Sequence, residues 1–179
     1  MFGFGKKKSV SEDKNLYTPL AGTVIDLEKV SDPVFAKKVM GDGYAIEPTS
    51  NDIVSPVAGE VSLVQGHAIG FTRADGLEVL LHLGIDTVSL NGQPFQIKVK
   101  VGDIVDGGDA LGQVNWKEVE AAGLPLTSMV LITNTNEKLD SLTVKKGIAQ
   151  AGDLLGKIKR RNHGRLQKIS NRNYCCCWW

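Results

Sequence analysis

The 179-residue sequence has no cysteine outside one run of three near its end, Cys175 to Cys177. A body without cysteine excludes a disulfide framework and is typical of proteins in a reducing compartment. No apolar run approaches the roughly 20 residues that a membrane-spanning helix needs. The N-terminal residues M-F-G-F-G-K-K-K also lack the apolar region of a secretory signal. We therefore expect a cytoplasmic protein.

Proline is scarce and glycine is plentiful, with 6 Pro against 20 Gly. The glycines separate short runs rich in Val, Ile and Leu, a pattern that favours many strands joined by tight turns. The length suits one domain with a sizeable core.

Two pairs of segments repeat within the chain. T-P-L-A-G-T-V at Thr18–Val24 returns as S-P-V-A-G-E-V at Ser55–Val61, and G-G-D-A-L-G-Q-V at Gly107–Val114 returns as A-G-D-L-L-G-K-I at Ala151–Ile158. Such repeats indicate related strand–turn–strand units, too few and too unevenly spaced for a solenoid. The predicted fold is all-β, an antiparallel β-sandwich or flattened barrel with internally related strand units and little helix.

The two ends differ in composition from the body. The composition of residues 1–16 predicts a flexible leader. Residues 160–179 contain no acidic residue and show no clear periodicity, so this second segment is predicted to be a disordered or artefactual tail. The domain is expected to span residues 17–159. The alternative for residues 1–8 is weak membrane-surface contact, since Phe2 and Phe4 lie beside three lysines.

Charge is distributed unevenly along the chain. Residues 15–158 hold 11 Lys or Arg against 18 Asp or Glu, a net charge of −7, whereas the whole chain is at +1. An acidic domain argues against nucleic acid as the main partner and is compatible with docking onto a basic protein surface.

The stretch G-L-E-V-L-L-H-L-G, Gly76 to Gly84, predicts a short buried strand bounded by glycines. Alternation places Val79, Leu81 and Leu83 on one face, and Glu78, Leu80 and His82 on the other. One face can fill a core, while the other presents an imidazole beside an aliphatic side chain.

A second histidine, His67, lies 15 residues upstream in Q-G-H-A-I-G-F. The intervening T-R-A-D-G ends in Asp-Gly, a strong turn signal, and predicts an antiparallel hairpin. His67 and His82 are nearly equidistant from this turn, so we expect them to be close cross-strand neighbours on one face. Alternation also groups His67 with Ile69 and Phe71.

These motifs carry a family resemblance. G-H-A-I-G-F followed by E-V-L-L-H-L-G-I-D-T-V-S-L-N-G, with D-P-V-F-A-K-K-V-M-G-D-G-Y-A-I-E-P and S-P-V-A-G, resembles the glucose-type enzyme IIA domain of the bacterial phosphoenolpyruvate-dependent sugar phosphotransferase system. The resemblance runs from about residue 17 to 159 and implies a fold of the duplicated hybrid motif type. It implies that His82 accepts and passes on a phosphoryl group with support from His67, and that no cofactor or metal is needed.

By the same resemblance, the phosphoryl donor is the histidine-containing phosphocarrier protein and the acceptor is a cysteine on the enzyme IIB domain of a sugar permease. Further residues gain roles from this likeness. Gln65, Gly84 and Asp86 would support the phosphoryl site, with Gln65 standing where many relatives carry Thr. The partner-docking surface would be formed by Asp32, Phe35, Val39, Met40, Leu80 and Val88.

Two alternatives remain at this level. One is a zinc hydrolase that uses His67, His82 and Asp86 as ligands, although the usual H-x-H pair is missing. The other is a regulatory module that binds transporters or metabolic enzymes according to its phosphorylation state. The sugar also stays open among glucose, N-acetylglucosamine, sucrose, β-glucosides and trehalose.

Overall fold

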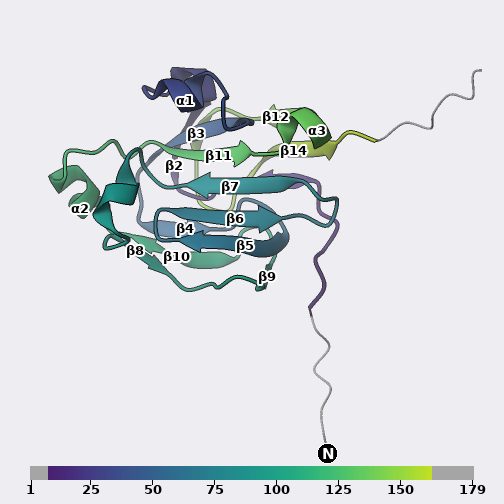
Figure 1. Cartoon of the computed structure of the whole chain (residues 1–179), viewed down its shortest axis with the longest axis horizontal. Coiled ribbons are helices and arrows are strands. Elements are labelled where there is room, and N and C mark those ends of the chain that lie inside the picture. The colour runs from purple at the N-terminus through teal and green to yellow at the C-terminus, as the bar shows by residue number, and fades with distance from the viewer. Residues whose placement is uncertain (1–7, 163–179) are drawn as a thin grey trace, which may run out of the picture.

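The computed structural model describes residues 8–162 of the chain (Figure 1). The candidate membrane-contacting Phe2 and Phe4 and the cysteine run lie outside the described residues. Within residues 8–162, no helix is long and apolar enough to cross a bilayer.

Strands dominate the described part of the chain, and the predicted all-β fold with little helix is confirmed. The strands are β1 (Asn15–Tyr17), β2 (Gly22–Asp26), β3 (Asp42–Pro48), β4 (Asp52–Val54), β5 (Gly59–Gln65), β6 (Ala68–Thr72), β7 (Glu78–His82), β8 (Phe95–Ile97), β9 (Ile104–Val105), β10 (Ala110–Val114), β11 (Ser128–Ile132), β12 (Leu139–Val144), β13 (Gly147–Ala149) and β14 (Leu154–Arg160). The helices are short: α1 (Pro33–Ala36), α2 (Trp116–Ala121), α3 (Thr135–Lys138), and the 3₁₀ turns η1 (Leu27–Lys29) and η2 (Thr87–Leu90).

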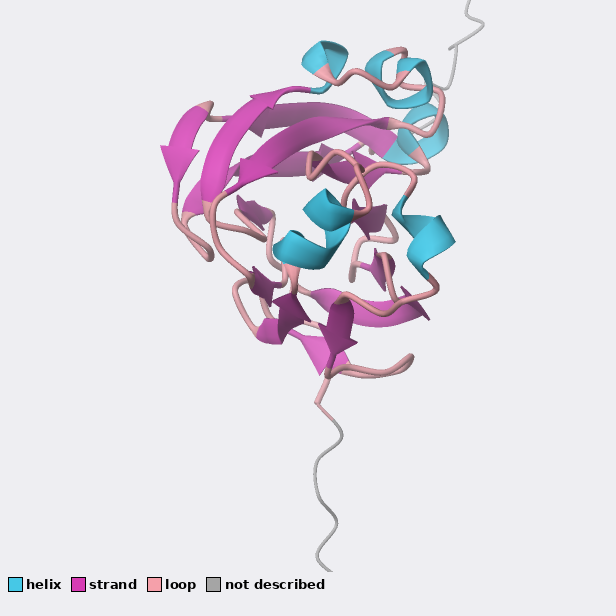
Figure 2. Ribbon diagram, turned by 90° about the vertical axis from the view of Figure 1, so that its left-hand side faces the viewer, coloured by secondary structure: helices cyan, strands magenta, loops and turns pink. Residues whose placement is uncertain are grey.

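The strands form one large antiparallel sheet and two small ones. The large sheet has the order β13-β2-β3-β11-β7-β6-β5-β9, and the small sheets have the orders β1-β14-β12 and β4-β10-β8. Figure 2 shows the large sheet curving over the shorter strands, so that the main core lies between them. The architecture is an open sandwich.

The repeated segments make equivalent hydrogen bonds, which confirms the predicted relation between strand units. Thr18 N donates to Asp153 O and Gly152 N to Thr18 O; Ser55 N donates to Asp109 O and Gly108 N to Ser55 O. The two copies also join each other reciprocally. Tyr17 N donates to Pro56 O at 2.9 Å, and Val54 N donates to Pro19 O at 2.9 Å.

The large sheet is apolar on both faces where β3, β11 and β7 lie side by side. Its inner face contributes Val79, Leu81 and Val130 to the main core. Its outer face carries a second cluster, formed by Leu27, Val30, Phe35, Ala45, Ile85, Met129 and Leu131, with Ile25 and Leu80 packed against it. Elements η1 and α1 cover part of this outer face (Figure 1). The strands that bear the second cluster therefore have apolar side chains on both sides.

The ordered structure begins before the expected boundary at residue 17. Strand β1 starts at Asn15, and Leu16 is fully buried in the main core. Further upstream, Lys8 forms an ion pair with Asp106 at 2.8 Å. At the other end, β14 continues to Arg160, close to the expected boundary at residue 159.

Helix α1 is a single short turn that follows Asp32. The Asp32 carboxylate accepts from Val34 N at 2.7 Å and caps the helix, which ends at Ala36. Lys38 then adopts a left-handed conformation with φ of 56°. For this reason Phe35 and Val39, although four residues apart, do not lie on one side: Phe35 is buried, whereas Val39 is 71 % exposed.

Substitution of Gly43 tests how closely β3 approaches β11. A Cβ at Gly43 would lie 1.9 Å from Val130 O, a backbone atom of the neighbouring strand. We expect Gly43→Ala to lower the free energy of unfolding by about 2–3 kcal/mol or more, because the ladder itself must move. Urea unfolding measures the loss.

Gly123→Ala is the matched control, since Gly123 has φ of +74° but no atom lies within 4 Å of the position that a Cβ would occupy. Its loss should be confined to left-handed backbone strain, about 1 kcal/mol. Equal losses for the two variants would contradict the close approach.

Candidate active site

His82 ends strand β7 on the outer face of the large sheet. Its neighbours Val79 and Leu81 pack into the main core, whereas Leu80 packs against the second cluster. The predicted alternation along this strand is therefore confirmed. His82 itself is half-buried, so one part of the ring is packed and another part faces the surface.

His67 lies in the tight turn between β5 and β6, immediately before the hairpin strand begins. The β6–β7 register pairs Ala68 with His82, and Leu83 N donates to His67 O at 2.8 Å. The two imidazole centroids lie 5.1 Å apart with an interplanar angle of 70°. The structure thus brings together the two rings that the sequence spacing paired.

The reason for this proximity differs from the expected one. Ile69 pairs with Leu81 on the inner face, so a continuous strand would have sent His67 to that face, away from His82. The turn instead ends the alternation and directs the ring to the outer side. Gly66 permits this turn to pack tightly, because a Cβ there would lie 2.6 Å from the Gly92 Cα.

A hydrogen bond to the backbone fixes the proton position of His82. Its Nδ1 lies 2.8 Å from Gly84 O. A carbonyl oxygen can only accept, so Nδ1 carries the proton and the neutral ring keeps its lone pair on Nε2. Nε2 is thereby the nucleophilic atom of this ring.

The position of Gly84 is itself tightly constrained. Gly84 has φ of +74°, and a Cβ would lie 2.5 Å from Thr87 Cγ2. Its N–H donates to Ser128 Oγ at 3.1 Å, and Thr87 Oγ1 donates to Leu83 O at 2.6 Å. Sequence reasoning identified Gly84 but missed Ser128 and Thr87, since nothing in their local sequence signals these contacts.

An aromatic side chain, Phe35, lies beside the His82 ring. The ring centroids of Phe35 and His82 are 5.2 Å apart with an interplanar angle of 57°. Phe35 is only 7 % exposed, so it is a wall of the site and not an open part of the predicted docking surface. Asp32 acts at a distance from the ring, as the cap of the helix that carries Phe35.

The other residues of the predicted docking surface differ in exposure. Val39 and Val88 are 71 % and 62 % exposed, and Met40 is 39 % exposed. Leu80 is half-buried against the second cluster. Exposed aliphatic side chains therefore occur on the segments that follow α1 and that form η2.

Gln65 and Asp86 are both exposed. Gln65 pairs with Ala68, which pairs with His82, so the three residues form one row across β5, β6 and β7. Asp86 precedes η2 in a left-handed conformation with φ of 59°, and its side chain makes no capping hydrogen bond. Its carboxylate and that of Asp32 act on His82 through charge, and each raises the pKa of His82 slightly against larger effects.

Burial favours the neutral form of both histidines. Desolvation lowers the pKa of His67 below its ordinary value of 6.5. It also lowers the pKa of His82; the bond to Gly84 O opposes this shift, and the charge of His67 adds to it. Both rings are therefore neutral near pH 7, the state in which a lone pair is available on nitrogen.

The zinc-hydrolase alternative is not supported by the geometry. Across residues 8–162, no three or more His, Cys, Asp or Glu side chains are grouped so that they could hold a metal ion. His67, His82 and Asp86 are thus not assembled as a ligand set.

Comparison with known proteins identifies the family of the chain. Residues 14–138 match the family model described as phosphoenolpyruvate-dependent sugar phosphotransferase system, EIIA 1. A glucose-specific EIIA component of Staphylococcus aureus is 44 % identical over 136 residues, covering 75 % of this chain and 82 % of that protein. A glucose-specific EIICBA component of Streptococcus pneumoniae is 43 % identical over 152 residues, which are 80 % of this chain and 21 % of that protein.

A solved structure, glucose permease IIA from Mycoplasma capricolum, superposes with a TM-score of 0.72 at 36 % identity, covering 87 % of this chain and 98 % of that one. The fold and these matches define an EIIA component of a sugar phosphotransferase system. The chain belongs to the EIIA 1 family of the phosphoenolpyruvate-dependent sugar phosphotransferase system.

Ser128→Ala tests the support beneath Gly84. Without the Ser128 hydroxyl, the Gly84 N–H loses its acceptor, at a cost of about 1–3 kcal/mol in the free energy of unfolding. We expect the Gly84 carbonyl to loosen and His82 to populate both neutral tautomers, which the ¹⁵N shifts of its ring report. Ser89→Ala is the control, because Ser89 is exposed and donates to Asp86 O instead. An unchanged tautomer in Ser128→Ala would contradict the proposed support.

The lowered pKa values predict a pH dependence of stability. The folded state resists protonation of His82, whereas the unfolded chain binds protons near pH 6.5, so the free energy of unfolding should be constant above 6.5 and fall as the pH drops below it. His82→Gln should reduce this slope. Urea unfolding between about pH 7.5 and 5, with an NMR titration of the rings, provides the measurement; a His82 that titrates above 6.5 would refute the assignment.

Proposed function

We propose that this chain is a cytoplasmic phosphoryl carrier that receives phosphate on His82 Nε2 and passes it to a sugar permease. The observation that carries the proposal is the hydrogen bond from Nδ1 to Gly84 O, because it leaves Nε2 free beside a second imidazole. Neutral imidazole is a competent nucleophile that accepts and releases phosphoryl groups without a cofactor.

In the first transfer, the Nε2 lone pair of His82 attacks the phosphorus of a phosphohistidine on the histidine-containing phosphocarrier protein. The new N–P bond forms as the donor N–P bond breaks, and the bonding pair returns to the donor nitrogen. Nδ1 keeps its proton, and Gly84 O stabilises the positive charge that the ring gains. The transition state is loose and in-line, so positioning is the main requirement.

In the second transfer, a cysteine thiolate of an enzyme IIB domain attacks the same phosphorus, and the His82 N–P bond breaks. His82 returns to its neutral form with the lone pair on Nε2. The cycle therefore consumes no group on this chain, which acts as a relay.

His67 would stabilise the transferred group. Within residues 8–162, neither of its ring nitrogens has a hydrogen-bond partner, and its ring lies 5.1 Å from that of His82 between centroids. An N–H of His67 can then donate to a phosphoryl oxygen, which is worth a few kcal/mol in a partly dry site. Gln65, at the end of the same row, would supply a further polar group at the margin.

We assign partner docking to the exposed aliphatic side chains of Val39, Met40 and Val88, with Leu80 at the margin of the site. Such side chains exclude water from the labile N–P bond when a partner binds. Asp32 and Asp86 would meet basic side chains of the partners, in keeping with the net charge of −7 over residues 15–158.

The relatives suggest the acceptor and the sugar. The Streptococcus pneumoniae relative is named as a single EIICBA component, which supports an enzyme IIB domain as the partner. The names of the Staphylococcus aureus and Mycoplasma capricolum proteins both refer to glucose, so we propose glucose as the transported sugar.

Radiolabelled phosphoenolpyruvate, enzyme I and the phosphocarrier protein should place acid-labile, alkali-stable label on the wild-type chain. His82→Ala should take up none, because it lacks the nucleophile. His67→Gln should accept label and pass it to a glucose IIB domain at least about tenfold more slowly, since it loses a donor in the transition state. Gel autoradiography and rapid-quench kinetics are the measurements.

His163→Gln is the control, since His163 is the only other histidine of the sequence, and it should behave as the wild type. Label on His82→Ala at the wild-type level would overturn the assignment of roles. Transfer to other IIB domains at the same rate would overturn glucose as the sugar while leaving the carrier role intact.

A further inference from the structure

A cavity of about 320 Å³ lies at the far end of the β6–β7 hairpin from the histidines. Its walls come from three segments: residues 11–14 before β1, residues 73–75 in the hairpin turn, and residues 159–160 with Asn162 at the end of β14. Figure 1 shows the N-terminal segment running beside this turn. The five residues of β6 separate the cavity from the histidine pair by about 16 Å.

The cavity contains a buried arginine with an unused donor group. Arg73 is 4 % exposed, and its Nε and Nη2 donate to the two carboxylate oxygens of Asp75 at 3.2 and 3.0 Å. Its Nη1 is buried and has no hydrogen-bond partner among the described residues. A buried charged donor left unpaired is destabilising, so this group favours an incoming acceptor.

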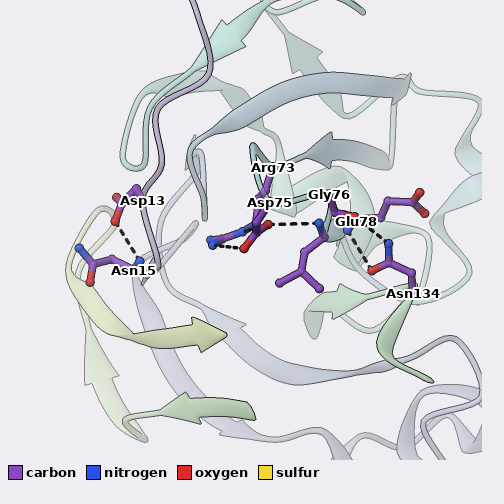
Figure 3. Close-up of polar contacts among 8 residues, drawn as sticks. Asp13, Asn15, Arg73, Asp75, Gly76, Glu78 and Asn134 are labelled. Atoms are coloured by element: carbon purple, nitrogen blue, oxygen red, sulfur yellow. Dashed lines mark hydrogen bonds and ion pairs between the residues drawn. The ribbon is translucent and has the colours of Figure 1, made fainter. Parts of the chain in front are cut away.

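Three further cations line the cavity, and two of them, Lys14 and Arg160, have no ion-pair partner among the described residues. The third, Lys159, is engaged by Asp140 outside the cavity at 2.9 Å. Figure 3 shows the Arg73 guanidinium paired with Asp75 and directed toward the segment of Asp13 and Asn15.

The carboxylates of the cavity are mostly engaged. Asp75 is paired with Arg73, and this pairing offsets the effect of burial, so that the pKa of Asp75 stays below its usual value. Asp13 accepts from Asn15 N and from the Tyr17 hydroxyl, both at 2.9 Å. Glu12 is the remaining carboxylate in the wall and is exposed. Counting only partners within residues 8–162, the free donors of the cavity therefore belong to Arg73, Lys14 and Arg160.

The turn that presents Arg73 is held firmly. Asn134 donates from Nδ2 to Gly76 O and accepts from Glu78 N, both at 3.1 Å (Figure 3). Lys138 Nζ also donates to Gly76 O at 3.1 Å. Arg73 therefore approaches a ligand from a fixed backbone, which lowers the entropic cost of binding.

We propose that this cavity binds a small tetrahedral oxyanion of the phosphate class. Three cationic side chains, one from each of the three wall segments, line the cavity, a set better matched to the several oxygens of a phosphate than to the two of a carboxylate. Because Arg73 is buried, an oxygen held by Nη1 would be removed from bulk water. In such a poorly hydrated environment a charge-assisted hydrogen bond is strong. The site is separate from His82 and does not depend on the proposed carrier role.

Titration of the unphosphorylated full-length chain with inorganic phosphate tests the proposal, with amide NMR at constant ionic strength as the readout. We expect saturable shifts centred on Lys14, Asp75 and Arg160, together with a rise in melting temperature that equal concentrations of chloride do not give. Arg160→Gln and Arg73→Gln should each weaken binding at least fivefold. Arg160 is exposed, so its variant decides the matter if the Arg73 variant does not fold.

Lys157→Gln is the matched control, because it removes the same charge from β14 at an exposed position outside the cavity. His82→Ala should bind phosphate as the wild type does, which separates this site from the histidine pair. Non-saturating shifts, equal weakening in Lys157→Gln, a loss of binding in His82→Ala, or binding only to phosphatidylglycerol vesicles would each overturn the proposal.

Discussion

The hydrogen bond from His82 Nδ1 to Gly84 O is the constraint on which the site depends. This hydrogen bond decides which ring nitrogen keeps its lone pair. It spans 2.8 Å to a backbone carbonyl oxygen, which can accept a hydrogen bond but cannot donate one. That carbonyl is aimed by a left-handed glycine, by the Ser128 hydroxyl and by the packing of Thr87. The proposed phosphoryl-accepting atom, Nε2, is thus placed by the main chain, which varies less in position than a second mobile side chain would.

The two apolar faces of the large sheet explain how strand β7 stays rigid while its last residue, His82, is only half-buried. The inner face is part of the main core, and the outer face is covered by the second cluster as far as Leu80. His82 lies at the margin of that cover, and both Phe35 and His67 contact its ring. Partial burial lowers the pKa of both rings and so keeps them neutral, which is the same condition that nucleophilic attack requires.

Sequence patterns predicted the parts of the structure that follow from local periodicity. The alternation through Val79 and Leu81, the Asp-Gly turn, and the relation between the Thr18 and Ser55 segments are all present. These features depend on period-two burial and on turn chemistry, which a single sequence displays.

What the sequence did not predict depends on contacts between distant segments. Strict alternation groups His67 with Ile69 and would have placed the His67 ring on the inner face. The turn between β5 and β6 interrupts this alternation, and it depends on the tight packing of Gly66 against Gly92. Ser128 reaches Gly84 across 44 positions of sequence, so no local motif records it. Helix α1 ends early because Lys38 turns left-handed, which the spacing of Phe35 and Val39 does not reveal.

The duplication explains why the histidines lie where they do. The order of the large sheet reads symmetrically about the β11–β7 boundary, with β2 matching β5, β3 matching β6 and β13 matching β9. In one half, the link between β2 and β3 is long and carries η1 and α1, which supply Phe35. In the other half, the link between β5 and β6 is the short turn that carries His67. His82 lies on β7, at the seam between the halves, where both links reach it. Two related halves with different equivalent connections thus provide a rigid frame. At their junction they bring Phe35, His67 and His82 together, an asymmetric cluster that neither half could form alone.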